Sequence, residues 1–180
     1  MSTIIVGDGP AGLSAALFLA KKGMEVTVFG KNETAMHYAM LYNYLGIEEM
    51  TGTAFQEISR KQVASFGARL EDKFVESITA GDTFTITTDD KQTHTSKYLI
   101  IAEGKGMKLC NNLGLELALS GVQVDRDGRT DIDRLYVIGR GTKLRRSQAI
   151  ISAGEGASCA LDILSAEAGK DVLDYDSVDK

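Results

Sequence analysis

The chain has 180 residues, of which 43% are hydrophobic and 25% are charged, and its formal net charge is −5. This length suffices for one well-buried α/β domain and is short for two. The negative charge argues against a nucleic-acid partner, and no predicted segment has the long apolar run of a membrane span. The two cysteines lie far apart without C-x-x-C spacing, which favours a reducing, cytoplasmic setting.

The first predicted unit is a strand, a glycine turn, a helix and a second strand. A β-branched strand at 3–6 leads into Gly-Asp-Gly-Pro-Ala-Gly at 7–12, followed by an Ala/Leu-rich helix to 22 and a strand at 25–29. In a G-x-G-x-x-G turn, Gly7 permits the tight bend, Gly9 lets the backbone approach a pyrophosphate and Gly12 allows close helix packing. This context predicts a dinucleotide site at the helix N-terminus.

One part of this fingerprint is missing. An acidic residue after the second strand normally binds the ribose hydroxyls, but Gly30 and Lys31 stand there. Glu33 lies close enough to substitute if the loop folds back. There are three other interpretations. The backbone contacts the ribose, Lys31 lies near a phosphate, or Glu33 is a solvated loop residue.

A helix and four β segments are predicted in the middle of the chain. A capping box at Thr53 opens a helix that runs to about residue 66. A third strand follows at 68–71, and alternating residues at 73–79, 83–88 and 93–96 predict an antiparallel meander, which we expect as a third layer. The side of the helix expected to be apolar carries Phe55, Ile58, Gln62 and Phe66.

The apolar run at 98–104 predicts a buried central parallel strand. A linker is expected at 105–120, a strand at 135–139, a helix at about 148–168 and a loose acidic tail at 171–180. The prediction is an α/β fold with a parallel central sheet and an antiparallel β-meander. Residues 1–170 then form one domain.

These motifs together resemble the thioredoxin reductase branch of the flavin-dependent pyridine nucleotide-disulfide oxidoreductases. The glycine turn resembles the family's FAD fingerprint, residues 42–46 its Asn-x-Pro-Gly loop and residues 99–104 its Leu-Ile-Ile-Ala-Thr-Gly strand. Residues 127–139 resemble its second FAD segment, and Gln148-Ala149 falls at the family spacing after Gly139. The resemblance implies a Rossmann-like three-layer FAD-binding domain, FAD as cofactor and a homodimer.

The resemblance also implies a set of cofactor contacts, whereas it points to no catalytic residue and no metal site in this chain. The expected FAD-binding residues are Gly7, Gly9, Pro10, Ala11, Gly12, Phe29, Gly30, Lys31, Asn43, Val75, Ala102, Glu103, Gly104, Gly139, Arg140, Gln148, Ala149 and Ile150.

Two features of full-length reductases are missing from this sequence. Their NAD(P)H domain stands where this chain has only residues 105–120, and their active-site C-x-x-C is absent. The chain therefore resembles a short, single-domain type of the family, with electrons supplied by free NAD(P)H or by a redox partner protein. The alternatives are a non-catalytic nucleotide-binding or regulatory module, and an interaction subunit whose flavin site has decayed.

The family usually carries an Asp that binds the ribityl chain where this chain has Arg140. Arg donates hydrogen bonds and accepts none, so Arg140 either reaches the pyrophosphate or points to solvent and weakens flavin binding. The helix from Gln148 would stabilise negative charge at its N-terminus, and Gly154 and Gly156 would let it pack closely.

The remaining candidates are weaker. Tyr38, Met40, Tyr42 and Tyr44 would share one side of an extended segment, against the flavin or in a packing contact. His37 reads as a surface residue or an acid–base group.

His94 reads as a solvent-facing residue of the meander. Cys110 would be a reactive thiol only if exposed, and Cys159 reads as a buried small hydrophobe.

Overall fold

A five-stranded parallel sheet forms the centre of the computed structural model, which describes residues 1–178. Its strand order is β12-β9-β1-β2-β5, and every neighbouring pair is parallel. The order reverses beside β1, and a crevice for ligands forms at such a point, outside the carboxyl ends of the strands. The strands are β1 (Ser2–Val6), β2 (Glu25–Phe29), β5 (Arg69–Glu71), β9 (Tyr98–Ile101) and β12 (Leu135–Val137).

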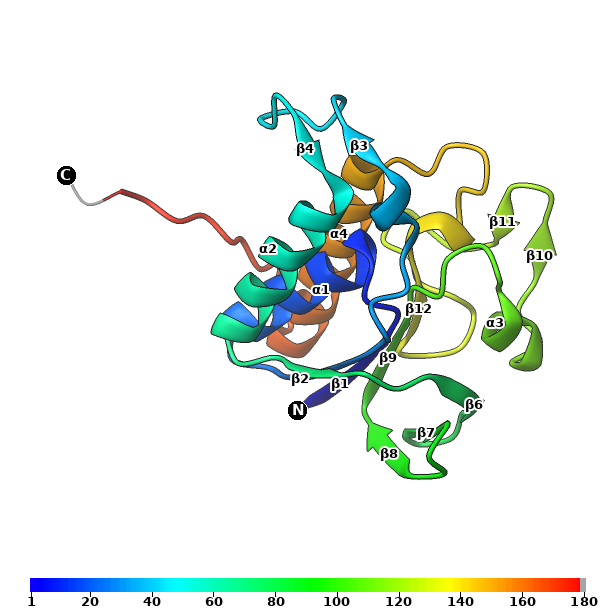
Figure 1. Ribbon diagram of the computed structural model, residues 1–180. Coiled ribbons are helices and arrows are strands. Elements are labelled where there is room, and N and C mark those ends of the chain that lie inside the picture. Colours follow the sequence, from blue (N-terminus) through cyan, green and yellow to red (C-terminus); the bar gives the residue numbers. More distant parts are fainter. Residues whose placement is uncertain (179–180) are drawn as a thin grey trace.

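Different layers cover the two faces of this sheet (Figure 1). Helices α1 (Pro10–Lys21), α2 (Gly52–Ser65) and α4 (Ala149–Ala168) pack on one face, against Ile5 and Ile100. Ile4 and Leu99, their strand neighbours, point to the other face. That face is covered by the meander β6 (Val75–Thr79), β7 (Phe84–Thr88) and β8 (Thr93–Ser96) and by α3 (Lys108–Asn112). The predicted three-layer α/β class is confirmed.

The expected linker at 105–120 is folded rather than irregular. It contains α3 and the first strand of the hairpin β10 (Leu117–Ala118) and β11 (Gly121–Val122). The Glu103 carboxylate accepts hydrogen bonds from the backbone N–H of Leu109 (3.0 Å) and Cys110 (3.1 Å), which fixes the start of α3 against β9. Apolar burial of Leu109 and Cys110 completes this attachment.

Two 3₁₀ turns and a second short hairpin complete the described structure. The turns are η1 (Ala35–Tyr38) and η2 (Gly139–Gly141), and the hairpin pairs β3 (Met40–Leu41) with β4 (Met50–Thr51).

Helix α2 begins earlier than predicted and turns a different side to the core. Thr51, not Thr53, is its N-cap, because the Thr51 hydroxyl accepts from the Ala54 N–H at 3.2 Å. The buried side carries Gln56 and Val63, whereas Ile58 is 53% exposed and Phe66 45% exposed. Gln56 faces inward because its amide donates to the Asp8 carbonyl oxygen, a contact that an apolar-periodicity argument cannot foresee.

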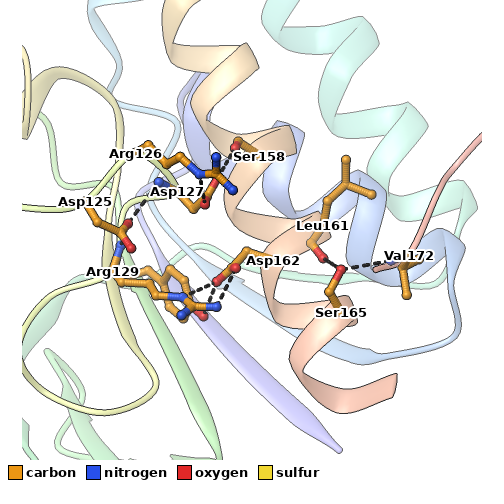
Figure 2. Close-up of polar contacts among 10 residues, drawn as sticks. Asp125, Arg126, Asp127, Arg129, Ser158, Leu161, Asp162, Ser165 and Val172 are labelled. Atoms are coloured by element: carbon orange, nitrogen blue, oxygen red, sulfur yellow. Dashed lines mark hydrogen bonds and ion pairs between the residues drawn. The ribbon is translucent and has the colours of Figure 1, made fainter. Parts of the chain in front are cut away.

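The loop before β12 holds α4 in place (Figure 2). The Ser158 hydroxyl donates to Asp127 at 2.7 Å, and Arg129 makes two bonds of 2.6 Å to Asp162. The Tyr136 hydroxyl donates to the same Asp162 carboxylate at 2.7 Å. These contacts link α4 to β12 and thereby help direct its N-terminus to the carboxyl edge of the sheet.

Helix α4 also contacts α1 closely at one glycine. A Cβ on Gly156 would lie 2.2 Å from the Ala11 carbonyl oxygen, so only glycine fits there. A Cβ on Gly154 would meet no atom within 4 Å, and the expectation that Gly154 also permits close packing is wrong. Successive α4 residues diverge by about 100°, so two positions two residues apart do not share a face.

One helix among residues 1–178, α4, is long and apolar enough to cross a membrane by length and composition alone, contrary to the sequence reading. Core helices of compact domains meet the same criterion. Cys159, Ala160 and Ile163 of α4 are fully buried in the cluster that α4 shares with α1 and the sheet.

The segment after α4, predicted as a loose tail, forms no helix or strand through residue 178, and Val172 and Asp174 are among its residues that contact the domain. The Val172 N–H donates to the Ser165 hydroxyl at 2.9 Å (Figure 2), and Asp174 forms ion pairs with Lys21 (3.0 Å) and Lys22 (2.8 Å). The Asp174 side chain is only 5% exposed. The last two positions of the predicted tail, 179–180, lie outside the described residues.

A pH-dependent contribution to stability follows from Asp174. Hydrogen bonds from Lys22 and Lys21 lower its pKa in the folded chain below the ordinary 3.8. A depressed carboxyl pKa stabilises the fold above the unfolded-state value and loses that contribution as the pH falls through the folded-state value. We expect Asp174→Asn to lower the urea midpoint at pH 7, and the difference from wild type to shrink below about pH 4.

The matched control is Asp171→Asn, which removes an exposed carboxylate of the same segment that has no ion pair within residues 1–178. Equal urea midpoints for Asp174→Asn and wild type at pH 7 would show that the ion pairs do not anchor this segment.

Candidate functional site

A cavity of about 650 Å³ opens at the carboxyl edge of the sheet, beside the reversal of strand order. Its volume lies in the range of small-molecule and cofactor sites. The chain segments that follow β1, β2, β9 and β12 meet there, together with the first turns of α1 and α4. The predicted residues that line it are Gly7, Gly9, Pro10, Ala11, Phe29, Gly30, Lys31, Val75, Ala102, Glu103, Gly104, Gly139, Arg140, Gln148 and Ala149.

Three predicted contact residues are not part of the lining. Gly12 packs on the glycine turn, where a Cβ would lie 1.9 Å from the Gly7 carbonyl oxygen. The Asn43 amide donates to the Gln148 side-chain oxygen at 3.1 Å, so Asn43 positions a lining residue. Ile150 is 36% exposed, because Ala149 and Ser152, three residues apart, share the side of α4 that faces the cavity.

Glycine occupies the positions of the turn for different physical reasons. Gly7 has a φ of 108°, and a Cβ there would lie 2.2 Å from the Ala102 carbonyl oxygen, so β9 requires this glycine. Gly9 has ordinary extended backbone (φ −79°, ψ −174°), and its Cβ would meet only the Thr34 hydroxyl, at 3.4 Å. The protein itself therefore does not require glycine at position 9, whereas a ligand lying against the backbone would.

Two helix N-termini reach the cavity without a side-chain cap. Gly9 is the N-cap of α1 and Gln148 the N-cap of α4, and within the described chain neither helix has a capping side chain or an acidic residue in its first turn. The first intrahelical bonds are Leu13 N–H to Gly9 and Ser152 N–H to Gln148, each 2.9 Å. Earlier backbone N–H groups such as Ala11 and Ala149 remain available to an anion.

Asp8 is a structural residue of the site that the sequence reading did not single out. Its buried carboxylate forms an ion pair with Arg60 and accepts the Asn32 N–H at 3.0 Å, while its carbonyl oxygen accepts from Gln56. These contacts tie the glycine turn to α2 and to the loop after β2. The sequence signal for this role was the acidic side chain of Asp8 within the glycine turn, because a buried carboxylate requires a cationic partner.

The loop after β2 pairs with the meander. The Lys31 ammonium lies 2.5 Å from Asp89 and 4.6 Å from the Phe74 ring centroid, so Lys31 lines the cavity with its charge already paired. The hydrogen bond from Lys31 lowers the pKa of Asp89. Glu33 lines the cavity as well, which leaves it in place for a ribose contact.

The aromatic run does not form a stripe on the cavity. Tyr38 and Tyr42 are exposed, Met40 is partly exposed, and Tyr44 packs on Phe55 with ring centroids 5.4 Å apart. The segment is not extended, because η1 and the two-residue strand β3 redirect it.

The histidines are structural. The His37 ring bridges the Thr53 hydroxyl (3.0 Å) and the Asn32 carbonyl oxygen (2.8 Å), which ties η1 to α2. The His94 ring packs on Phe29 with centroids 4.9 Å apart, so the expectation of a solvent-facing His94 is wrong.

Both thiols are fully buried, and burial raises the pKa of Cys110 to about 12 and that of Cys159 well above its ordinary value. A thiolate, which would be the reactive species, is disfavoured at both positions. Within residues 1–178 no three His, Cys, Asp or Glu side chains come together as metal ligands.

Comparison with known proteins assigns the family. The model of the pyridine nucleotide-disulphide oxidoreductases matches residues 1–111, more than half of the chain. The chain belongs to this family. The matched part includes the glycine turn, the meander and β9, and thus many of the residues that line the cavity.

Curated relatives of this chain include thioredoxin reductases. The chain is 34% identical over 128 residues to the thioredoxin reductase of Streptomyces clavuligerus (67% of this chain, 39% of the relative). It is 31% identical over 110 residues to the bifunctional thioredoxin reductase/thioredoxin of Mycobacterium leprae (58% and 24%). The chain thus spans less than half the length of these relatives.

Solved structures share the fold. The atypical thioredoxin reductase TRi from Desulfovibrio vulgaris Hildenborough superposes with a TM-score of 0.86 at 19% identity, covering 93% of this chain and 98% of that chain. A thioredoxin reductase from Gloeobacter violaceus gives 0.85 at 17% identity, covering 98% of each. The chain therefore has the Rossmann-like fold of these thioredoxin reductases.

The cavity fits a dinucleotide on three observations of its own residues. Gly9 leaves its backbone accessible, and two uncapped helix N-termini offer N–H donors. The Arg140 Nε is buried without an acceptor within the described residues. Each feature is explained by an anionic ligand that approaches the backbone.

Proposed function

We propose that this chain is an FAD-binding, thioredoxin reductase-like oxidoreductase or electron-carrying flavoprotein. The observation that carries the proposal is the cavity between two uncapped helix N-termini at the carboxyl edge of a parallel sheet. Family membership supports the choice of a flavin dinucleotide. FAD would supply reversible electron transfer, while the protein supplies binding, orientation and electrostatics.

The lining residues divide into groups along the cavity. Gly9 and Ala11 would hold the diphosphate through backbone N–H groups, and Glu33 would hold the ribose. Ala149, at the start of α4, would donate its N–H to the edge of the ring system that gains negative charge on reduction. Asn43 keeps the Gln148 side chain in place beside it.

We propose that electrons come from outside this chain. Between β9 and β12 the described chain forms only α3, β10 and β11, which supports the proposal that no separate NAD(P)H domain is inserted there. Its two cysteines are buried on opposite faces of the sheet, Cys110 in the meander-side core and Cys159 in the helix-side core. A dithiol relay is therefore not available, and free NAD(P)H or a redox partner protein is the proposed donor.

The absorption spectrum of the purified protein tests this proposal, followed by anaerobic addition of NADH or NADPH. We expect a flavin spectrum that bleaches with the nicotinamide, or with a partner reductase if the nicotinamide alone is ineffective. A protein that is colourless and does not take up FAD on reconstitution contradicts the proposal.

The second candidate is a nucleotide-binding or regulatory module without turnover. The observation that favours it is that several ionisable groups of the cavity are engaged in structural contacts. Asp8 pairs with Arg60, Glu103 caps α3, and Lys31 pairs with Asp89. Stoichiometric FAD that cannot be reduced in the bound state, or stoichiometric ADP, would favour this candidate, and an empty site would favour an interaction subunit.

The proposal includes a homodimer in the cytoplasm, without nucleic-acid or membrane partners. Light scattering of the purified protein should give twice the mass of one chain. Cell fractionation should recover the protein in the soluble fraction, and recovery with membranes would contradict that part.

A further inference from the structure

The cavity carries an excess of positive charge in a chain whose net charge is −5. Its lining has five basic and three acidic residues, which are Lys31, Lys73, Lys105, Lys108 and Arg140 against Asp8, Glu33 and Glu103. A concave site with charge opposite to that of the whole chain indicates a negatively charged ligand.

Two of the five cations are already neutralised by the meander. Lys31 pairs with Asp89, and Lys73 lies 2.9 Å from Asp90. Lys105, Lys108 and Arg140, here called the basic rim, have no carboxylate partner within residues 1–178. The nearby Glu103 carboxylate is occupied by the N–H groups at the start of α3. The basic rim thus lies outside any ion pair, and against Glu33 and Glu103 it leaves the lining with a small excess of positive charge.

The backbone places Arg140 between the glycine turn and the loop that carries the two lysines. A Cβ on Gly139 would lie 2.8 Å from the Ala11 Cβ, in the first turn of α1. A Cβ on Gly141 would lie 3.2 Å from the Gly104 carbonyl oxygen, next to Lys105. Arg140 therefore lies near both the N-terminus of α1 and the loop that carries Lys105.

The Arg140 Nε is buried and, within the described residues, has no hydrogen-bond acceptor. A buried N–H without a partner is rare in folded proteins, because it loses its hydrogen bond to water without replacement. A guanidinium donates two parallel bonds to phosphate oxygens, and lysines add point charges. A phosphoryl group of a ligand in the cavity that Arg140 lines is an acceptor of the right charge for this N–H.

We infer that the basic rim binds the diphosphate of the nucleotide ligand and makes the cavity select diphosphate-bearing flavins over riboflavin. Arg140 supplies the pair of parallel N–H donors, and Lys105 and Lys108 supply the surrounding positive charge. This inference rests on the proposed function in taking the nucleotide to be FAD. Arg140 is then a specificity-determining residue rather than a defect of the site.

The first test is a titration of FAD and of riboflavin into wild-type protein and Arg140→Ala, followed by flavin fluorescence. We expect Arg140→Ala to weaken FAD binding at least about tenfold, the value of a charge-assisted hydrogen bond, and to leave riboflavin binding unchanged. Lys105→Ala and Lys108→Ala should each weaken FAD binding about two- to fivefold, as exposed charges do.

The matched control is Arg145→Ala, which removes an exposed arginine outside the cavity lining. FAD binding should be unchanged in this variant. Arg140→Lys should bind FAD more tightly than Arg140→Ala, because lysine keeps the positive charge but cannot donate two parallel hydrogen bonds. Thermal unfolding of each ligand-free variant checks that the fold is intact.

The second test uses inorganic pyrophosphate and the NMR signal of the Arg140 Nε–H, so it does not depend on flavin. Pyrophosphate should shift this signal in wild-type protein, and a signal that does not move overturns the inference. Equal FAD affinity of wild type and Arg140→Ala, or tighter FAD binding by Arg140→Asp, also overturns it. Pyrophosphate bound at Arg140 by a protein that takes up no flavin overturns the proposed function and retains the basic rim.

Discussion

Replacing Gly9 by valine is expected to abolish FAD binding while leaving the domain folded. The backbone at Gly9 is extended and open to any residue, and an added Cβ would meet only the Thr34 hydroxyl at 3.4 Å. The isopropyl group would therefore project into the cavity, where the ligand approaches the turn. We expect FAD affinity to fall at least about 100-fold, because a displaced ligand also loses its bonds to the α1 N-terminus.

The free energy of unfolding of the ligand-free protein should fall by less than about 1 kcal/mol in Gly9→Val, mainly from a poorer N-cap. Flavin titration and urea unfolding give the two quantities separately. Gly81→Val is the control, because Gly81 lies in an exposed bend outside the cavity and a Cβ there would approach only the Thr83 carbonyl oxygen, at 3.7 Å. Unchanged FAD affinity in Gly9→Val would show that no ligand lies against this turn.

Replacing Gly156 by alanine is expected to destabilise the protein by about 3 kcal/mol, the upper range for overpacking a buried contact. The new methyl group would lie 2.2 Å from the Ala11 carbonyl oxygen, which belongs to the backbone and cannot rotate away. Helices α1 and α4 would have to separate, although their buried residues share one core cluster. Urea unfolding measures the loss.

Gly154→Ala provides the matched control within the same helix. A Cβ there meets nothing within 4 Å, and alanine is a better helix former than glycine, so we expect stabilisation by about 0.5–1 kcal/mol. Opposite signs for two Gly→Ala changes two residues apart would establish the α1–α4 contact. Similar effects at the two positions would contradict it.

Local patterns in the sequence were enough to predict the fold. The β-branched run before the glycine turn, the apolar run at 98–104 and the alternation in the meander correspond to β1, β9 and β6–β8. Helix boundaries were less accurate, as Thr51 rather than Thr53 begins α2. The side of α2 that is buried could not be read from periodicity, because a hydrogen bond from Gln56 to the backbone of Asp8 turns that side inward.

The candidate site was predictable where backbone conformation defines it. The residues that follow parallel strands must meet at one edge of the sheet, so the glycine turn, the end of β9 and the turn after β12 line one cavity. Side chains on irregular loops were not predictable in this way. The aromatic run at 38–44 is turned away by η1, and His94 packs on Phe29 instead of facing solvent.

By itself the sequence determined the strand and helix types, the parallel sheet and the glycine turn, since these depend on hydrophobic period and on local backbone freedom. Only the tertiary structure decided which charges are available. Lys31 and Arg140 look alike in sequence, but Asp89 neutralises Lys31, whereas Arg140 has a buried N–H without an acceptor in the described chain. Charge pairing depends on distances between segments remote in sequence, and those distances exist only after the layers have packed.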